Sequence, residues 1–477
     1  MEATATATSS PASSGFRRRR RVLMFPLPFH GHTSPMLQLA GALHARGGLD
    51  VTVFHAAFSA PPPSPAPPAA CRFVPVGEGV PSDDLLPSGS DGDFIGAVLR
   101  IDERLRAPFR DRLRQVLDDE DDGGGAAAAA PACLVLDSNL RGMQTAAEEL
   151  GVPTLALRTG GAACLVAYMA FPALCGKGLL PPTSQDQAHL DMLLTEVPPL
   201  RLRDMLFSST TTHANMTKCL ERLLESSRCS SGVILNTFQD LEGSDLQKIT
   251  DGLGVPIYAI GPLHKISWDT ESSLLEQDRA CLEWLDNQET SSVLYVSFGT
   301  LASMDEKELM EIAWGLANSQ MPFLWVIRHN MVQSSKGMSL PDGFNEVTSG
   351  KGMVVSWAPQ RDVLKHRAVG GLWTHGGWNS TLESICEGVP MITRPLFADQ
   401  MINARYVQEV WKIGFELEGQ LERGTIEGAV RKLMCEEEGR AMRKSAEDLK
   451  KSSIQCIEKG GSSSAALDSL LKRIMSF

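Results

Sequence analysis

A turn from an apolar run into a helix, at residues 372–380 (Leu-Trp-Thr-His-Gly-Gly-Trp-Asn-Ser), gathers the side chains best suited to chemistry. Asn379 and Ser380 favour helix N-termini, and Glu383 follows Ser380 by three residues, as in a capping box. Capping alone would explain Ser380 and Glu383, but not the His375, glycines and tryptophans beside them. A helix N-terminus presents unpaired N–H groups and positive potential, and glycines let an oxyanion approach. We therefore expect an anion site here, with His375 and Ser380 as added donors.

The turn belongs to a chain in which short β-rich apolar runs alternate with stretches of helical period. This alternation predicts parallel sheets covered by helices. The expected strands cover residues 22–27, 51–55, 133–137, 154–157 and 232–235 in the first half, and 292–298, 323–328, 353–356, 371–374 and 389–393 in the second. The expected fold class is α/β, with two facing Rossmann-like domains and a ligand site in the cleft between them.

The two halves meet near residues 260–262 (Ile-Gly-Pro). We expect a disordered tail over residues 1–16, an N-terminal domain over 17–260, a C-terminal domain over 261–455 and a closing helix over 456–477. The amphipathic pattern of that closing segment runs from about residue 454 to 475 and predicts one helix, which could pack back on the N-terminal domain.

Size and charge exclude several classes of protein. A chain of 477 residues exceeds the roughly 250 to 300 at which one core stops growing, so at least two domains are expected. A net charge of −12 argues against nucleic acid as a partner. The ten cysteines form no CxxC pair, which is typical of buried thiols in a reducing compartment.

The N-terminus imitates a signal peptide, because arginines at 17–21 precede an apolar run. Pro26 and Pro28 interrupt that run after four residues, and no cleavage site follows. Residues 1–16 are rich in Ala, Thr and Ser, so a transit peptide stays open beside the disordered tail. No run approaches the 18 or so apolar residues of a membrane span. We expect a cytoplasmic monomer.

The segment 357–400 carries four short motifs in a fixed order: Trp-Ala-Pro-Gln at 357–360, His-Gly-Gly-Trp-Asn-Ser at 375–380, a Glu to Gly-Val-Pro stretch at 383–390 and Asp-Gln at 399–400. In order and in its length of 44 residues it resembles the signature box of plant family 1 UDP-glycosyltransferases. Residues 26–32 and 295–300 resemble the opening strands of that family's two domains. Departures are His30, where relatives often have Gln, and Gly376, where Asn, Cys or Ser is common.

The resemblance implies a GT-B fold in which the C-terminal domain binds a UDP-sugar and the N-terminal domain binds an acceptor. Trp357 would stack on uracil, with polar contacts from the Ala358 backbone and Gln360, and Glu383 would hold the ribose hydroxyls. The residues implied at the diphosphate are Ser297, Thr300, His375, Asn379 and Ser380. Those implied at the sugar are Trp378, Asp399, Gln400 and Thr159. A closing Gln accompanies glucose as the donor sugar in this family.

The resemblance also implies the catalytic pair. His32 follows the first expected strand and matches the family's base, which draws the proton from the acceptor hydroxyl. Asp137 ends the strand at 133–137 and matches the partner that orients the imidazole. The implied reaction is a single displacement with inversion, which converts an α-linked UDP-sugar into a β-glycoside. His30, two residues away, could compete as base, but we assign the role to His32.

No metal or other cofactor is implied, because the helix N-terminus and its donors can stabilise the leaving diphosphate. Two alternatives stay open. An NAD-type oxidoreductase of similar fold would need GxGxxG after the first strand, and residues 26–32 contain one glycine. A non-catalytic nucleotide-sugar binder would lack the base, but His32 and Asp137 are both present.

The acceptor is expected to be small, hydrophobic and hydroxyl-bearing. Its pocket should come from loops at residues 83–106, 162–175 and 198–207, whose Leu, Met and Phe residues suit an apolar or aromatic molecule. The sequence leaves its identity open.

Overall fold

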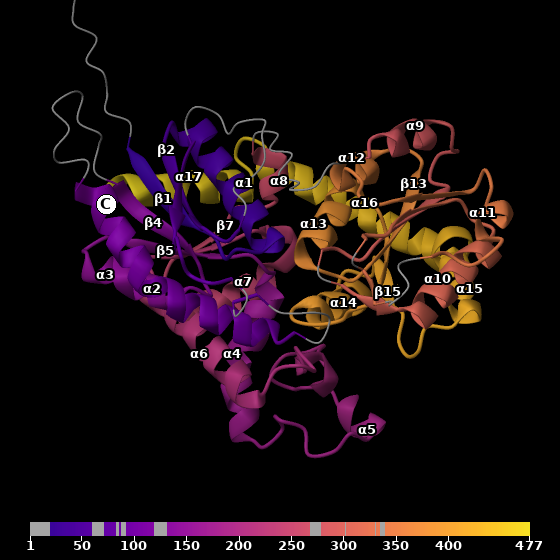
Figure 1. Cartoon of the computed structure of the whole chain (residues 1–477), viewed down its shortest axis with the longest axis horizontal. Coiled ribbons are helices and arrows are strands. Elements are labelled where there is room, and N and C mark those ends of the chain that lie inside the picture. The colour runs from indigo at the N-terminus through magenta and orange to yellow at the C-terminus, as the bar shows by residue number, and fades with distance from the viewer. Residues whose placement is uncertain are drawn as a thin grey trace, which may run out of the picture.

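The structure, a computed structural model, describes residues 20–59, 71–82, 85–86, 92–118, 131–267, 278–300, 302–329, 331–333 and 339–477. The expected tail over residues 1–16 lies outside these ranges. Two parallel sheets, each covered by helices, lie side by side (Figure 1). The expected α/β class with two Rossmann-like units is confirmed.

The N-terminal sheet has seven parallel strands in the order β3-β2-β1-β4-β5-β6-β7. They are β1 (Arg21–Phe25), β2 (Asp50–Ala56), β3 (Cys71–Val76), β4 (Pro131–Asp137), β5 (Thr154–Arg158), β6 (Val233–Leu235) and β7 (Ile257–Ala259). The strand order reverses between β1 and β4, where ligands of such sheets bind. Two strands of this sheet, β3 and β7, were missed, because their apolar runs are short and are broken or flanked by polar residues or proline; three short strands that follow residue 300 were missed as well.

The C-terminal sheet has six parallel strands in the order β12-β10-β8-β13-β14-β15, and β9 and β11 form a separate pair. The strands are β8 (Val293–Ser297), β9 (Met304–Asp305), β10 (Phe323–Val326), β11 (Val332–Gln333), β12 (Gly352–Val355), β13 (Val369–Thr374), β14 (Met391–Thr393) and β15 (Gly414–Glu416). Here the order reverses between β8 and β13, so the turn at 372–380 stands at this sheet's switch point.

Helices cover both faces of each sheet. Those up to the end of β7 are α1 (His30–Gly47), α2 (Phe94–Asp118), α3 (Arg141–Glu149), α4 (Ala162–Gly176), α5 (Gln187–Leu190), the 3₁₀ helix η1 (Leu202–Met205), α6 (His213–Cys229) and α7 (Gln239–Leu253). Those after β7 are α8 (Leu263–Ile266), α9 (Ala280–Asp286), α10 (Glu306–Ser319), α11 (Phe344–Val347), α12 (Gln360–Lys365), α13 (Trp378–Glu387), α14 (Gln400–Glu409), α15 (Arg423–Cys435), α16 (Glu437–Ile457) and α17 (Ser462–Ser476).

Two segments expected to be acceptor loops are largely helical. Residues 94–106 belong to α2 and residues 162–175 to α4. Helix α4 is apolar around most of its circumference and largely buried, so it lacks the one-sided pattern that reveals a helix in sequence. None of the helices in the described ranges is long and apolar enough to cross a membrane.

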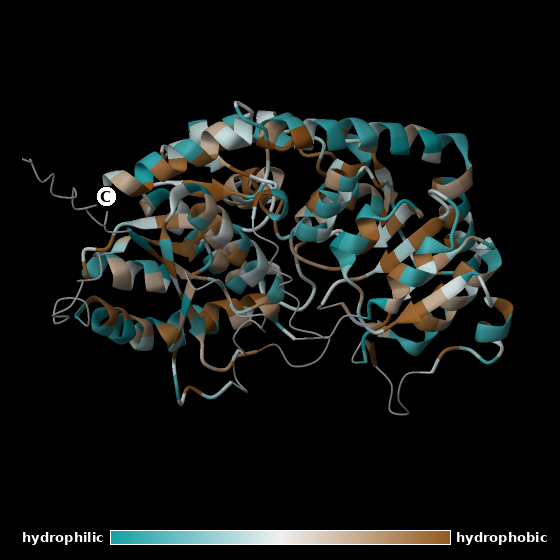
Figure 2. Cartoon of the chain, turned by 90° about the horizontal axis from the view of Figure 1, so that it is seen from above, coloured by the Kyte–Doolittle hydropathy of each residue, from teal (hydrophilic) through white to brown (hydrophobic). Residues whose placement is uncertain are grey.

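The single closing helix expected near residues 454–475 is two helices, α16 and α17. They are separated at Gly460, which has φ +91°, and Gly461, where a Cβ would lie 2.2 Å from the Gln455 carbonyl oxygen. Only glycines fit this tight break. In Figure 2 the two helices form the upper edge of the molecule and reach from one half to the other. Leu467 and Leu470 of α17 share a buried cluster with residues of the N-terminal sheet.

Candidate active site between the two sheets

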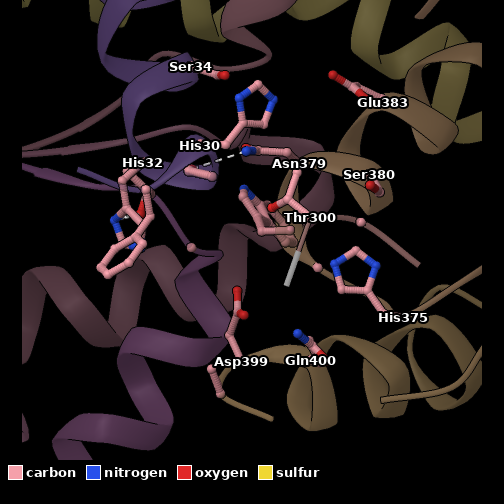
Figure 3. Close-up of a pocket in the computed structure, with 18 of the residues that line it drawn as sticks. His30, His32, Ser34, Thr300, His375, Asn379, Ser380, Glu383, Asp399 and Gln400 are labelled. Carbon is pink, nitrogen blue, oxygen red and sulfur yellow. Dashed lines mark hydrogen bonds between the residues drawn. The ribbon is translucent and has the colours of Figure 1, made fainter. Parts of the chain in front are cut away.

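A pocket of about 520 Å³ opens between the carboxyl ends of the two sheets, a volume typical of small-molecule sites (Figure 3). Every residue expected at the site lines it except Asp137, which is fully buried behind His32. The residues brought together are His32, Thr159, Ser297, Thr300, Trp357, Ala358, Gln360, His375, Trp378, Asn379, Ser380, Glu383, Asp399 and Gln400.

His32 lies in the first turn of α1, directly after β1. Its Nδ1 is 2.6 Å from Asp137 Oδ2, and Thr159 Oγ1 is 3.0 Å from the same nitrogen. An ionised carboxylate can only accept, so Nδ1 carries the proton and Nε2 keeps its lone pair. The ring is therefore held in the tautomer that a general base requires.

Asp137 is held in its ionised form. Burial alone would raise the pKa of this carboxyl, but the His32 ring and two Asn139 donors outweigh it and lower the pKa. The backbone N–H and side-chain Nδ2 of Asn139 donate to Asp137 Oδ1 over 3.0 and 2.8 Å. Both carboxylate oxygens are thus occupied, one by the imidazole and one by Asn139.

His30 lacks this support. Its ring packs edge-on against Trp357, with ring centroids 6.3 Å apart, and burial lowers the pKa of its imidazole. The carboxylate of Asp137 lies against His32 instead. The geometry therefore favours His32 over His30 as the base.

His375 sits between two glycines at the end of β13. A Cβ on Gly299 or Gly377 would lie 2.6 or 2.5 Å from the ring, so both positions must lack a side chain. Thr374 Oγ1 accepts from the Gly376 N–H over 3.4 Å and lies 3.2 Å from His375 Nδ1. The Thr374 hydroxyl still has its proton to donate to Nδ1, and the tautomer that this bond selects carries the His375 proton on Nε2. Burial lowers the pKa of His375 to about 4, so the ring is a neutral donor.

The expected capping box of Ser380 and Glu383 is wrong. Helix α13 begins at Trp378 with Gly377 as N-cap and has no side-chain cap. The glycine already gives the chain its turn, so Ser380 and Glu383 face the pocket from the first two turns. Ser380 Oγ and Glu383 Oε2 both accept from Gln360 Nε2, over 3.0 and 2.7 Å.

Gln360, Glu383 and Trp357 form one side of the pocket. Gln360 Oε1 lies 3.5 Å from the Tyr295 hydroxyl, which fixes the orientation of the amide. Burial raises the pKa of Glu383, and its bond to Gln360 opposes that rise. Trp357 presents a ring to the same space. An aromatic face beside a carboxylate and an amide can bind a nucleoside by stacking and hydrogen bonds.

Asp399 and Gln400 point into the pocket from the start of α14 (Figure 3). Gln400 Oε1 accepts from the backbone N–H groups of Leu396 and Phe397 over 2.8 and 3.2 Å, so the amide is held rigidly. Burial raises the pKa of Asp399, and the Arg158 cation opposes that rise. The pair offers an acceptor and a donor suited to sugar hydroxyls.

Trp378 and Asn379 also join the two halves. The Trp378 indole Nε1 donates to the Asn236 carbonyl oxygen over 2.9 Å, and Asn379 Nδ2 donates to the Gly31 carbonyl oxygen over 3.1 Å. The Trp378 indole N–H is thus used between the halves. What Trp378 can still offer a ligand is its backbone N–H in the first turn of α13.

Sequence reasoning missed Arg158, Asn139 and Asn236 as residues of the site region. Arg158 could have been found from its position, because it is a charged residue at the carboxyl end of a buried strand. Asn139 follows Asp137 by two residues, a spacing typical of a side chain closing a turn. Nothing in the sequence pairs Asn236 with Trp378. In the ranges that the structure covers, no three His, Cys, Asp or Glu side chains gather to hold a metal ion.

Comparisons with known proteins indicate the same family that segment 357–400 resembles. A family model described as "UDP-glucoronosyl and UDP-glucosyl transferase" matches residues 276–448. The chain is 43% identical to DIMBOA UDP-glucosyltransferase BX8 of Zea mays over 90% of this chain and 93% of that one. It is 41% identical to UDP-glycosyltransferase 76F2 of Arabidopsis thaliana over 97% and 98%. The structure of Phytolacca americana UGT2 complexed with UDP-2fluoro-glucose and pterostilbene matches at TM-score 0.77 and 28% identity, over 96% and 100%.

Proposed function

This chain belongs to the plant family 1 UDP-glycosyltransferases, and from that premise we propose that it transfers glucose from UDP-glucose to a hydroxyl or carboxyl group of a small plant metabolite, hormone or xenobiotic. The family indicated by segment 357–400 is thereby confirmed. The observation that carries the catalytic proposal is the 2.6 Å contact between Asp137 and His32, which lines a pocket shared by both halves.

In the proposed reaction, His32 Nε2 takes the proton of the acceptor hydroxyl as its oxygen attacks the anomeric carbon of glucose. The new C–O bond forms while the bond from that carbon to the diphosphate oxygen breaks, and UDP leaves with the electron pair. Attack from the side opposite the diphosphate inverts the configuration and gives a β-glucoside. Asp137 stabilises the imidazolium that results.

The leaving diphosphate would lie at the start of α13. Its negative charge would meet the N–H groups of that first turn, the His375 Nε2 proton and the hydroxyls of Ser380, Ser297 and Thr300. These donors are fixed before the reaction, so they stabilise the developing charge without rearranging. No metal takes part in the proposed reaction.

The rest of the donor would extend to both sides of the diphosphate. Trp357 would stack on uracil beside the backbone of Ala358, and Glu383 would accept from the ribose hydroxyls. Asp399 and Gln400 would hold the glucose hydroxyls, with Thr159 close to the sugar.

Aromatic side chains favour a flat acceptor. Phe94 packs against Phe29, with ring centroids 4.7 Å apart, and against Phe397 of the C-terminal half at 6.0 Å. On another side, Tyr168 packs edge-on against Phe207 at 5.0 Å. All five line the pocket. We propose that an aromatic or similarly apolar acceptor binds between these two groups and presents a hydroxyl to His32.

The test is to incubate the purified chain with UDP-glucose and a panel of phenolic, heterocyclic and terpenoid acceptors, and to follow product by mass. We expect hexosyl addition, with the β configuration by NMR. His32→Ala should abolish transfer while UDP still binds in calorimetry. Unchanged turnover in His32→Ala would refute the base, and an α product would refute the single displacement.

We further propose that residues 17–260 form the acceptor-binding unit and 261–455 the donor-binding unit, with 456–477 packing back on the first. The protein would act as a cytoplasmic monomer. Gel filtration with light scattering tests the monomer, and a fluorescent fusion tests the compartment.

A further inference from the structure

Arg158 is a buried cation at the edge of the pocket that the proposed reaction does not use. It ends β5, is 5% exposed and lines the pocket. Its Nη2 lies 3.5 Å from Cys164 Sγ, its guanidinium lies 5.1 Å from the centre of the Tyr168 ring, and its Nε has no hydrogen-bond partner among the described residues. Burying a guanidinium among such weak partners is unfavourable unless a negative charge lies close.

That charge is Asp399, from the opposite half. Arg158 Nη2 and Asp399 Oδ2 lie 3.1 and 3.2 Å from the point where a Cβ on Gly160 would be. The two groups therefore flank one glycine, close but without an ion pair within the described residues. The missing side chain at Gly160 is what lets them approach.

No other described group offers the Asp399 carboxylate a comparable positive charge from the opposite half. Asn403 Nδ2 donates to Asp399 Oδ2 over 3.3 Å, but it lies on the same helix and carries no charge. His32 is engaged by Asp137. Among the charged groups that favour the ionised form of Asp399, Arg158 acts most strongly and His32 less.

We propose that Arg158 is a positioning residue for the donor sugar, which holds the Asp399 carboxylate in place across the cleft so that it can accept from the glucose hydroxyls. The inference rests on the proposed function, in which Asp399 contacts the sugar. Arg158 belongs to the half that holds the base and Asp399 to the half that holds UDP. Their attraction therefore links donor-sugar binding to the closeness of the two halves.

The test compares Arg158→Met, Arg158→Lys, Asp399→Asn and the double variant Arg158→Met/Asp399→Asn in the full chain. Arg158→Met should raise KM for UDP-glucose roughly tenfold, the order expected for weakening hydrogen bonds to a charged group. The Kd for UDP, which lacks the sugar, should not change. Arg158→Lys should recover part of the loss, and the double variant should be no worse than Asp399→Asn alone, because coupled residues are not additive. Arg440→Met, an exposed arginine of α16 paired with Glu437, is the matched control.

The possible failures can be told apart. If Asp399→Asn raises KM for UDP-glucose but Arg158→Met does not, the inference is overturned and the proposed function stands. If Asp399→Asn changes nothing, the sugar role of Asp399 fails and the inference fails with it. A rise only in KM for the acceptor would assign Arg158 to the acceptor instead and overturn the inference. Should Arg158→Met not fold, Gly160→Ala puts a methyl between the two groups, and an unchanged KM for UDP-glucose in that variant overturns the inference.

Discussion

Asp137→Asn tests whether the buried carboxylate sets the tautomer of His32. In the native chain, Asp137 Oδ1 accepts two Asn139 donors over 3.0 and 2.8 Å, and Oδ2 lies 2.6 Å from His32 Nδ1. The oxygen of the new amide must stay with Asn139, because an NH₂ group there would face two N–H donors. The NH₂ group then faces Nδ1, so the imidazole must accept at Nδ1 and carry its proton on Nε2. The base loses the lone pair that it needs.

The expected loss in kcat follows from that tautomer. General-base catalysis contributes about 10² to 10⁴-fold, and a wrong tautomer in the serine-protease triad costs about 10⁴-fold. We expect kcat to fall about 10³ to 10⁴-fold, equivalent to about 4 to 5.5 kcal/mol of transition-state stabilisation. The Kd for UDP should stay within about twofold, because the residues expected to hold UDP lie on the other half.

The assay is UDP release at saturating UDP-glucose and acceptor, with UDP affinity from calorimetry. Asp102→Asn is the matched control. Asp102 is also buried at 2% exposure and accepts from the Gly142 N–H with both oxygens, over 2.8 and 3.0 Å, but does not line the pocket. Burial raises the pKa of Asp102 to about 6, and Arg222, whose Nη1 lies 3.4 Å from Oδ2, opposes that rise. Asp102→Asn loses this ion pair outside the pocket, so it should reduce stability and leave kcat unchanged. A folded Asp137→Asn variant that binds UDP and loses less than tenfold in kcat would refute the tautomer argument.

Three further outcomes are expected. Gly377→Ala puts a methyl 2.5 Å from His375 Nε2, so the imidazole ring must move. The Kd for UDP should therefore rise roughly tenfold in calorimetry. An unchanged Kd would show that His375 does not bind the diphosphate. Burial lowers the pKa of His375 to about 4, below the roughly 6.5 of a histidine in an unfolded chain. The neutral ring therefore makes its full contribution to folding stability above about pH 6.5, and that contribution is lost as the pH falls through 4. His375→Gln should flatten the decline in melting temperature over that range, and an identical pH profile would contradict the burial argument. Trp378→Phe removes the indole bond to the Asn236 carbonyl and should cost about 1 to 2 kcal/mol in denaturant unfolding, whereas equal stability would mean that water replaces the donor.

The predictions from sequence succeeded where local pattern decides structure. Strands β1, β4 and β13 are buried apolar runs that end at Phe25, Asp137 and Thr374, so the residues at and after these ends had to reach the edge where parallel strands end. The motif spacing also identified the pocket residues from 357 to 400. These features depend on neighbours in the chain.

The predictions failed where distant contacts decide. Helix α4 was taken for a loop because it is buried on nearly all sides, and that burial comes from the rest of the fold. Ser380 and Glu383 were taken for a cap because their spacing fits one, but Gln360 binds them instead. The closeness of Arg158 and Asp399 depends on how the two halves meet, which no local pattern contains.

The return of α17 to the first sheet has a consequence for biosynthesis. Leu467, Leu470 and Ile474 fill a cluster that also contains residues of β1 and β4. His32 follows β1, in the first turn of α1, and Asp137 ends β4. During translation these three side chains emerge after every strand of the C-terminal sheet, so the N-terminal sheet stays partly uncovered until that sheet has been made. The strands next to the proposed base are therefore covered only after the sheet of the proposed nucleotide-binding half has been made.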